Sequence, residues 1–523
     1  MNFLQKTLRS ITDNPRRVAI LILEGVLIGI FAGLIVCLYR FLLTESESTL
    51  QGILSAIKGD IYLIIGWFVI LVILGLVTGR LLRWEPFATG SGIPQVTAEI
   101  KGYFSPKWWK IIISKTIGGT LSTLAGLSLG REGPSIQLGG MAGKGISKLF
   151  KGSKTDEFRS IITGASAGLS ATFNAPLSGV VFSLEEITHN FDKSIIFVGL
   201  TAAIVADVIS KYFFGLSTIF RFPSSNFPLK YFWLFIILGI ILGFSGYFYN
   251  KTMVAGFDFS SKATNIPIEV KLVVTFLIVG VVSLFIPQIL GGGHLMVDTL
   301  YVAIPPLSVI IILLIAKYLL GIISFSSGAP GGIFFPLLVI GAYIGAAFGS
   351  FFVPIFGLHE YCVYKFIIIA MAGFFTATVR TPITAVVLVS EMTGTTENIV
   401  ATLIVCIIAY IIPTLLNNKP IYESIFTRLL KSNKISQETT KGRHILKDYV
   451  VPLNSYLIDK KIEEIPLSNN SIIVSVLREE NYIIARADLK IKFADHIYIL
   501  IDQEHYTFEN KEIVTLINKK INK

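Results

Sequence analysis

The chain has 523 residues, of which 53% are hydrophobic and 15% are charged. So apolar a composition excludes an ordinary soluble enzyme and predicts a polytopic α-helical membrane protein. The net charge of +11 could indicate a nucleic-acid partner, but many basic residues lie at the ends of apolar runs. Lys6, Arg9, Arg16 and Arg17 precede the first run. This is the positive-inside pattern, so we predict a protein of the cell membrane with a cytoplasmic N-terminus and no nucleic-acid partner.

Several apolar runs are near or above the ~20 residues that a spanning helix needs. They are Val18 to Leu43, Ile61 to Leu82, Tyr231 to Tyr249, Leu272 to Leu290, Leu307 to Ser324, Ile333 to Phe356 and Ile399 to Leu416. Two shorter pieces interrupted by glycine, Ile111 to Leu129 and Ile161 to Leu184, predict helices that enter or break within the membrane. The first run is full length and lacks a small-residue cleavage site, so we expect no cleavable signal peptide.

Residues that usually mark catalysis or metal binding are scattered. The three cysteines, Cys37, Cys362 and Cys406, stand alone in apolar runs, and the six histidines lack ligand spacing. No nucleophile stands beside a candidate base. We therefore predict neither an enzyme nor a metal site.

Charged residues stand inside an apolar region in the stretch from Gly130 to Gly139, which contains Arg131 and Glu132. Charges at membrane depth are costly and usually functional. Gly130, Gly133 and Pro134 break the helix, and irregular backbone at that depth is tolerated where protein or a water-filled cavity surrounds it. Free amides at the following helix N-terminus would suit an anion. The alternative is that Arg131 and Glu132 merely pair to hold two helices together.

The sequence also contains an internal repeat. Five residues of the first half are repeated 202 positions later: Gly126, Gly130, Pro134, Gly139 and Gly143 match Gly328, Gly332, Pro336, Gly341 and Gly345. A second block is repeated after 206 positions: Ala171, Thr172, Pro176, Val180, Val181 and Glu185 match Ala377, Thr378, Pro382, Val386, Val387 and Glu391. Duplicated membrane units with broken helices predict a solute site between the halves. Similar glycine usage in packed helices is the alternative.

Three motifs in order resemble the anion-site signatures of the CLC chloride channels and proton-coupled antiporters. They are Gly90 to Pro94, Gly130 to Pro134 and Gly331 to Pro336. The resemblance extends from about Val18 to Leu430 and includes Asn174 to Leu177 and Lys419 to Tyr422. It implies a CLC-type fold with two inverted-repeat halves, and a homodimer in which each subunit has its own pore.

The resemblance also implies which residues bind chloride. Ser91 matches a serine whose hydroxyl donates to the central anion, although a serine in this position could also cap a helix. Ile333 and Phe334 match residues that offer backbone amides. Tyr422 matches a tyrosine that offers its phenol from the cytoplasmic side, although Asn417 and Asn418 replace glycines that are common there.

Two glutamates match residues with a role in proton coupling. Glu132 matches the gating glutamate, a carboxylate that competes with chloride for the outer site and leaves it on protonation. Glu186 matches the internal glutamate that passes protons from the cytoplasm, although it could be an exposed acid at a helix end. Because Glu186, Ser91 and Tyr422 are all present, we predict a chloride/proton antiporter. Ser91 argues against the fluoride-exporting branch, and a passive voltage- or pH-gated chloride channel remains the alternative.

The composition changes after Leu430, where a polar and charged segment predicts a linker. Short β-like runs follow at Ile472 to Leu477, Tyr482 to Ala485 and Ile497 to Ile501, and Lys511 to Ile521 predicts a terminal helix. This α+β unit is similar to the RCK_C, or TrkA-C, regulatory domain of potassium transporters. The segments that carry the resemblance are Ser455 to Lys461, Ile472 to Arg478, Arg486 to Asp488 and Asp495 to Tyr498.

We thus divide the chain into a transmembrane domain (residues 1–430), a linker (431–446) and a regulatory domain (447–523). A pair of CBS domains would need more residues, and the chain has no filter of backbone carbonyls like that of a potassium channel. Basic residues after the last apolar run predict a cytoplasmic C-terminus: Lys419, Arg428, Lys431, Lys434, Lys441 and Arg443. Related domains imply cyclic di-AMP as a regulatory ligand at a dimer interface. The alternative is that the domain only strengthens the dimer.

Overall fold

The structure is a computed structural model that describes residues 15–216, 218–220, 222–223, 227–262, 266–433, 444–479, 481–502 and 505–519. The chain divides into a larger compact unit, residues 19–429, and a smaller one that contains residues 430–523. The topology predictions that rest on Lys6, Arg9, Lys434, Lys441 and Arg443 concern residues outside the described ranges.

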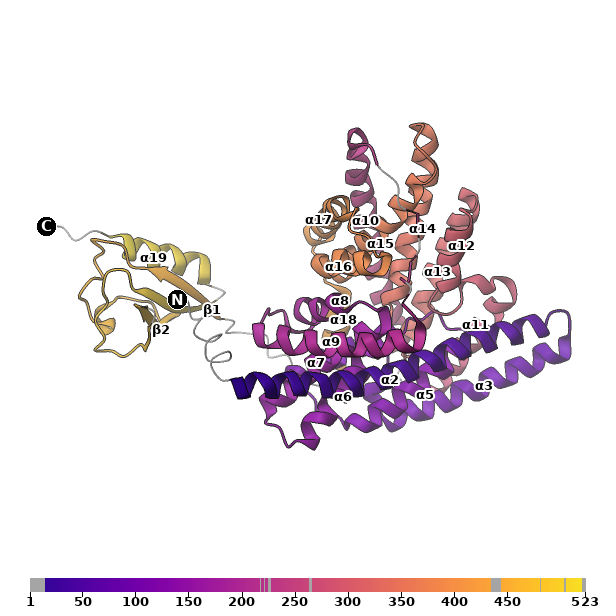
Figure 1. Cartoon of the computed structure of the whole chain (residues 1–523), viewed down its shortest axis with the longest axis horizontal. Helices are drawn as coiled ribbons and strands as arrows, with labels where there is room; N and C mark the ends of the chain where they lie inside the picture. The colour runs from indigo at the N-terminus through magenta and orange to yellow at the C-terminus, as the bar shows by residue number, and fades with distance from the viewer. Residues whose placement is uncertain are drawn as a thin grey trace. The chain divides into compact units, whose positions relative to one another are not determined.

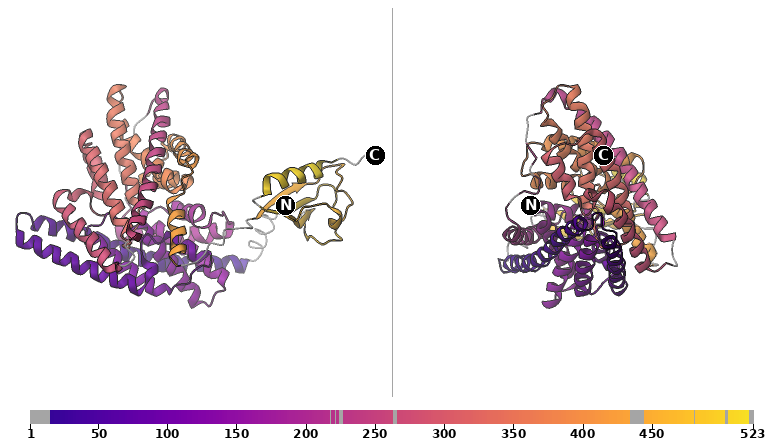
Figure 2. Two further views of the ribbon diagram at one scale, coloured as in Figure 1. Left: turned by 180° about the vertical axis from the view of Figure 1, so that it is seen from behind. Right: turned by 90° about the vertical axis from the view of Figure 1, so that its right-hand side faces the viewer.

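The larger unit is helical, and eight helices in the described part of the chain are long and apolar enough to cross a membrane. The first half contains α2 (Pro15–Ala56), α3 (Ile61–Trp84), α4 (Ile93–Ile100), α5 (Trp108–Leu124), α6 (Glu132–Leu149), α7 (Lys154–Phe173), α8 (Pro176–Phe182), the π-helical turn η2 (Ser183–Thr188) and α9 (Lys193–Phe214). The second half contains α10 (Trp233–Lys262), α11 (Ile268–Phe285), α12 (His294–Val302), α13 (Leu307–Ser326), α14 (Phe334–Ile355), α15 (Cys362–Val379), α16 (Pro382–Thr393), α17 (Ile399–Leu415) and α18 (Ile421–Ser432). Figures 1 and 2 show α2, α3 and α5 of the first half running along one edge of the helical unit, with α13 and α14 of the second half at a steep angle to them.

Two predicted segments differ from the observed helices. The first run was expected to end at Leu43, but α2 continues to Ala56 because Ser46, Leu50 and Leu54 extend its buried face at helical spacing. The stretch Ile161 to Leu184 is several elements, because Asn174 ends α7 in the left-handed conformation with φ 54°.

Close helix packing follows the repeat. A Cβ added to Gly143 of α6 would lie 1.9 Å from the Ser160 carbonyl oxygen of α7. Its counterpart Gly345 of α14 would place a Cβ 2.3 Å from the Phe366 carbonyl oxygen of α15. Real Cβ atoms cannot come so close, so the glycines allow the same backbone approach in both halves.

The two halves also make reciprocal contacts. The amide of Gly130 donates to the Gly332 carbonyl at 2.6 Å, and the amide of Gly332 donates to the Gly130 carbonyl at 2.7 Å. Glu185 accepts hydrogen bonds from the first turn of α16, while its counterpart Glu391 accepts from the first turn of α8. Exchanged contacts of this kind are the signature of a two-fold relation, as expected for inverted halves.

The smaller unit contains a four-stranded antiparallel sheet of order β1-β4-β2-β3. The elements are β1 (His444–Val450), β2 (Ser471–Arg478), β3 (Asn481–Ile484), β4 (His496–Asp502) and α19 (Tyr506–Asn518). Apolar side chains of the sheet and of α19 form its core, including Val476, Ile497, Ile499, Ile513 and Ile517.

Two bounds in the smaller unit differ from the predictions. Strand β1 begins inside the predicted linker, because His444 and Ile445 pair with the far end of β4. The terminal helix begins at Tyr506 rather than Lys511.

Candidate functional site

The three glycine-rich motifs meet through backbone hydrogen bonds. The amide of Gly90 donates to the Gly328 carbonyl, and the amide of Gly331 donates to the Gly90 carbonyl, both at 3.1 Å. The reciprocal Gly130 and Gly332 pair completes the junction. Helices α4, α6 and α14 all begin within these motifs, so their N-terminal amides lie close together.

Glu132 is the first residue of α6, and its side chain is fully buried. Oε2 accepts a hydrogen bond from the Phe335 amide at 3.3 Å, whereas Oε1 is buried with no partner among the described residues. The carboxylate therefore lies at the N-terminus of α14, where Ile333 is the N-cap and Phe334 the first residue. The Phe335 amide was missed at the sequence level, because a backbone donor leaves no mark on side-chain identity.

Ser91 and Tyr422 present a second polar surface at the junction. Both residues are 2% exposed, and within the described part of the chain neither hydroxyl has a hydrogen-bond partner. The Tyr422 hydroxyl lies near that of Ser91 and also near the carboxylates of Glu132 and Glu186. Buried hydroxyls without a protein partner are costly and are usually satisfied by a ligand or water.

The two asparagines before Tyr422 have a structural role. Asn417 adopts φ 51°, the left-handed conformation that glycine provides most easily and asparagine tolerates. The Asn418 side chain accepts a hydrogen bond from Asn250 of α10 at 3.1 Å. The departure from glycine therefore leaves the entry into α18 well supported.

Glu186 lies in the π-helical turn η2 rather than at the end of a regular helix. It is 8% exposed, and its charged neighbours are Glu185, Glu423 and Lys101. The adjacent Glu185 points to α16 and accepts from the Thr384 amide at 2.7 Å. Such π turns are frequent at functional sites.

Two buried lysines were not predicted from the sequence. Lys115 of α5 donates to the Gly90 carbonyl at 2.6 Å, and Lys317 of α13 donates to the Gly291 carbonyl at 2.8 Å. Each lysine holds the loop that precedes a short helix, α4 or α12. The two lysines are 202 positions apart, as are the repeated glycines, so the repeat itself was a signal that could have identified them.

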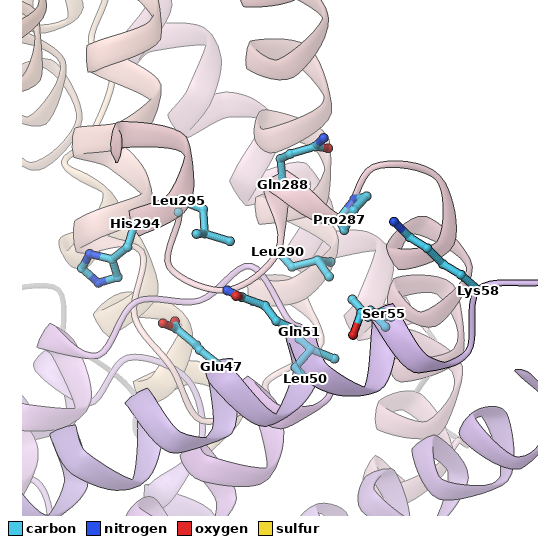
Figure 3. Close-up of a pocket in the computed structure, with 13 residues that line it drawn as sticks. Glu47, Leu50, Gln51, Ser55, Lys58, Pro287, Gln288, Leu290, His294 and Leu295 are labelled. Carbon is cyan, nitrogen blue, oxygen red and sulfur yellow. The ribbon is translucent and has the colours of Figure 1, made fainter. Parts of the chain in front are cut away.

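A pocket of about 270 Å³ lies between the second half of α2 and the turn before α12 (Figure 3). Glu47 and His294 line one end of it, and leucines line much of the rest. A Cβ added to Gly291 would lie 3.0 Å from Glu47 Oε1, so this carboxylate stands directly at the turn. The His294 ring also lies 4.0 Å from the ring of Phe335, whose amide binds Glu132.

A second cavity, of about 370 Å³, adjoins His294 from another side. Arg40 and Arg131 line it together with Asn174. Arg131 Nε is buried without a hydrogen-bond partner among the described residues, and the hydrogen bond to the Glu132 side chain comes from α14. The geometry thus gives no support to the alternative in which Arg131 and Glu132 serve to hold two helices together.

Comparison with protein families gives two matches. The voltage gated chloride channel family matches residues 74–414, and the TrkA-C domain matches residues 446–510. The chain belongs to the voltage-gated chloride channel family. Both resemblances that were based on the motifs are thereby confirmed.

Individual relatives extend this assignment. The H(+)/Cl(-) exchange transporter ClcA of Vibrio parahaemolyticus is 34% identical over 68% of this chain and 78% of that protein. The ClcA of Klebsiella pneumoniae is 31% identical over 82% of this chain and 93% of that protein. A solved structure of a slow cyanobacterial Cl−/H+ antiporter is 28% identical, with a TM-score of 0.76 over 79% of this chain and 99% of that chain. The predicted CLC-type fold is confirmed.

Proposed function

We propose that this chain is a chloride/proton antiporter in which Glu132 couples the two ions. The observation that carries the proposal is the Glu132 carboxylate at the N-terminus of α14, where the Phe335 amide donates to it. A carboxylate in that place mimics an anion, so chloride and ionised Glu132 compete for the same amides. Protonation removes the charge of Glu132, so the neutral side chain no longer competes with chloride for these amides. The names of relatives at 34% and 31% identity support chloride and protons as the exchanged ions.

The remaining site residues take separate roles in this proposal. The hydroxyls of Ser91 and Tyr422, which lack partners among the described residues, would donate to a chloride that has lost part of its hydration shell. The amides of Ile333 and Phe334 would bind the anion at the N-terminus of α14. Neutral donors suit a transported ion because binding must be weak enough for release.

Glu186 is proposed as the residue at which protons enter from the cytoplasmic side. Its charged neighbours, Glu185, Glu423 and Lys101, differ from those of Glu132, which supports a separate role for it. A passive chloride channel would have no need of this residue. The test therefore centres on Glu186.

Purified protein in liposomes separates the two functions. An outward chloride gradient should drive protons uphill in the wild type, and Glu186→Gln should lose proton movement while chloride still flows. Glu391→Gln, which removes a carboxylate from the matching contact of the second half, serves as a control. Equal chloride-driven proton movement in the wild type and in Glu186→Gln would refute the role of Glu186. Absence of uphill proton movement in the wild type would favour the channel.

We further propose that the TrkA-C unit is a cytoplasmic regulatory domain, that both termini are cytoplasmic and that the protein is a homodimer. We place the transmembrane domain at residues 1–430, the linker at 431–446 and the regulatory domain at 447–523, with the last three linker residues already paired in β1. Cyclic di-AMP at the dimer interface is the proposed ligand. Regulation requires that the ligand bind two transport states with different affinity. Calorimetry on the full-length protein should show micromolar binding, and chloride efflux should change with the nucleotide. Binding without a change in flux would leave the domain a dimerisation unit.

A further inference from the structure

A shallow groove of about 440 Å³ lies along the last turns of α3, on the surface of the larger unit. Its apolar lining comes from Leu76, Val77 and Leu81, and its polar end from Arg80 and Trp84. These residues are three or four positions apart, so they share one face of the helix. Leu76 and Val77 are both exposed, as lipid-facing residues of a spanning helix are. The groove therefore combines a surface suited to an acyl chain with a charged end.

The charges at this end of α3 are only partly balanced. Arg83 Nη2 donates to Glu269 Oε2 of α11 at 2.7 Å, whereas Arg80 Nε lies 3.6 Å from Oε1 of the same carboxylate, beyond hydrogen-bond distance. Within the described part of the chain, Glu269 is the one acid at ion-pair distance from either arginine. The Arg80 side chain is 77% exposed, so its guanidinium keeps donors for a second acidic group.

A third cation, Lys110, approaches from the neighbouring helix α5. Its ammonium lies 4.9 Å from the centre of the Trp84 ring and 5.9 Å from that of Trp109. The two rings meet edge to face at 5.8 Å, and both are exposed. Glu85, which directly follows α3, interacts with Lys110 electrostatically and also accepts a hydrogen bond from the Phe87 amide. Three cations thus stand beside two acids, and the surface keeps a net positive charge.

The groove lies where a spanning helix leaves the bilayer. Helices α2 and α3 are successive spanning helices, so with the proposed cytoplasmic N-terminus α3 ends on the cytoplasmic side. Tryptophan is enriched at the depth of the lipid headgroups, and anionic lipids of the cytoplasmic leaflet attract basic side chains. The volume of the groove falls within the range of about 300–1,000 Å³ that is usual for ligand sites.

We propose that the ends of α3 and α5 bind the headgroup of an anionic phospholipid such as phosphatidylglycerol. The lipid phosphate accepts hydrogen bonds from Arg80 and Lys110, because guanidinium and ammonium groups bind phosphate strongly. One acyl chain lies along Leu76 and Val77. Trp84 stands between the two, at the boundary of the apolar and charged parts. The site does not depend on which ions the protein carries.

The position of this site links it to the loop that carries Ser91. That loop follows α3 directly, and Lys115 of α5 donates to its Gly90 carbonyl at 2.6 Å. A lipid that contacts both α3 and α5 joins the two helices that hold the loop. The expected consequence is a more stable folded protein when the lipid is bound, since a ligand that binds the folded state alone stabilises it.

Native mass spectrometry of the full-length protein in a neutral detergent measures the binding. Phosphatidylglycerol is compared with phosphatidylcholine of identical acyl chains, and the wild type should bind the anionic lipid more tightly. Arg80→Gln and Lys110→Gln should each weaken phosphatidylglycerol binding about fivefold, the effect of one cation at a membrane surface. Neither should change phosphatidylcholine binding. Lys230→Gln is the matched control, because Lys230 is an exposed cation over the Tyr231 ring and lies outside the groove.

Thermal unfolding gives a second readout. Phosphatidylglycerol should raise the unfolding midpoint of the wild type and of Lys230→Gln, and much less that of Arg80→Gln. Equal affinity of the wild type for the two lipids would overturn the proposal, as would equal losses in Arg80→Gln and Lys230→Gln. Displacement of the lipid by glycerol 3-phosphate would assign the groove to a soluble phosphate instead. Dissociation of a dimer in Arg80→Gln, measured by light scattering, would assign this surface to a second copy of the chain.

Discussion

The two halves of the helical unit have nearly the same backbone around their short helices α4 and α12, yet different side chains. Gly92 and Gly293, which precede these helices, have φ values of 100° and 102°. Both preceding loops are held by a buried lysine, Lys115 or Lys317. Near α4, however, the Ser91 hydroxyl lacks a partner among the described residues, whereas near α12 the Glu47 carboxylate stands at the turn.

The difference shows how a duplicated unit can specialise. The backbone geometry has been kept in both halves, because it depends on glycine conformation and buried amines. In the first half the loop carries the Ser91 hydroxyl, which lacks a partner among the described residues and therefore suits a mobile ion. In the second half a carboxylate of the protein itself takes the corresponding place. A second difference, in the opposite sense, separates Glu132 from its counterpart Phe334, which follows 202 positions later and offers backbone alone.

The largest contrast is expected between Glu132 and Phe334. Glu132→Ala should abolish chloride-driven proton movement completely and leave chloride flux, because it removes the only carboxylate that contacts the amides of α14 among the described residues. Phe334→Leu should remain coupled, because its amide is unchanged. Parallel proton and chloride measurements in liposomes check both variants. Persistent uphill proton movement in Glu132→Ala would contradict the assignment.

The next contrast concerns the buried lysines. Lys115→Met and Lys317→Met should each destabilise the protein by about 2–3 kcal/mol, because backbone carbonyls lose a charged donor. Thermal unfolding followed by size exclusion in detergent measures this loss. Only Lys115→Met should also weaken chloride binding, since its loop carries Ser91. Similar loss of chloride affinity in both variants would mean that the two loops are functionally equivalent.

A smaller effect is expected at Ser91. Ser91→Ala removes one neutral donor, which is worth about 1 kcal/mol or roughly fivefold in chloride affinity. Isothermal titration with chloride measures it. Gly292→Ala, at the corresponding loop of the second half, should leave chloride affinity unchanged. An unaltered affinity in Ser91→Ala would remove the hydroxyl from the binding site.

The smallest contrast is between the two exchanged glutamates. Glu185→Ala and Glu391→Ala should each cost about 1 kcal/mol, the usual value of a lost helix N-cap. Because Glu186 follows Glu185 in the same π turn, Glu185→Ala should also slow proton transport. Glu391→Ala should change stability alone. If both variants transport protons equally well, the Glu185 contact does not position Glu186.

The sequence predicted those features that depend on residue type. Gly130 and Gly332 marked the repeat and the junction, and the isolated charge of Glu132 marked the site. Features that depend on three-dimensional contact were missed. The contact of the Phe335 amide with Glu132 and that of Arg40 with the Ala171 carbonyl join segments far apart in the chain. The π turn at Glu186 was missed because its residues have no distinctive pattern.

The paired hydrogen bonds between Gly130 and Gly332 bear on the ancestry of the chain. Each glycine gives and receives one bond with its own counterpart, so the contact could equally be formed by two separate copies of one half. Such copies would have to insert into the bilayer in opposite directions, because the halves are inverted. A single ancestral half could thus have assembled as a dual-topology pair. Fusion into one chain would then have freed Glu132 and Phe334 to become different residues.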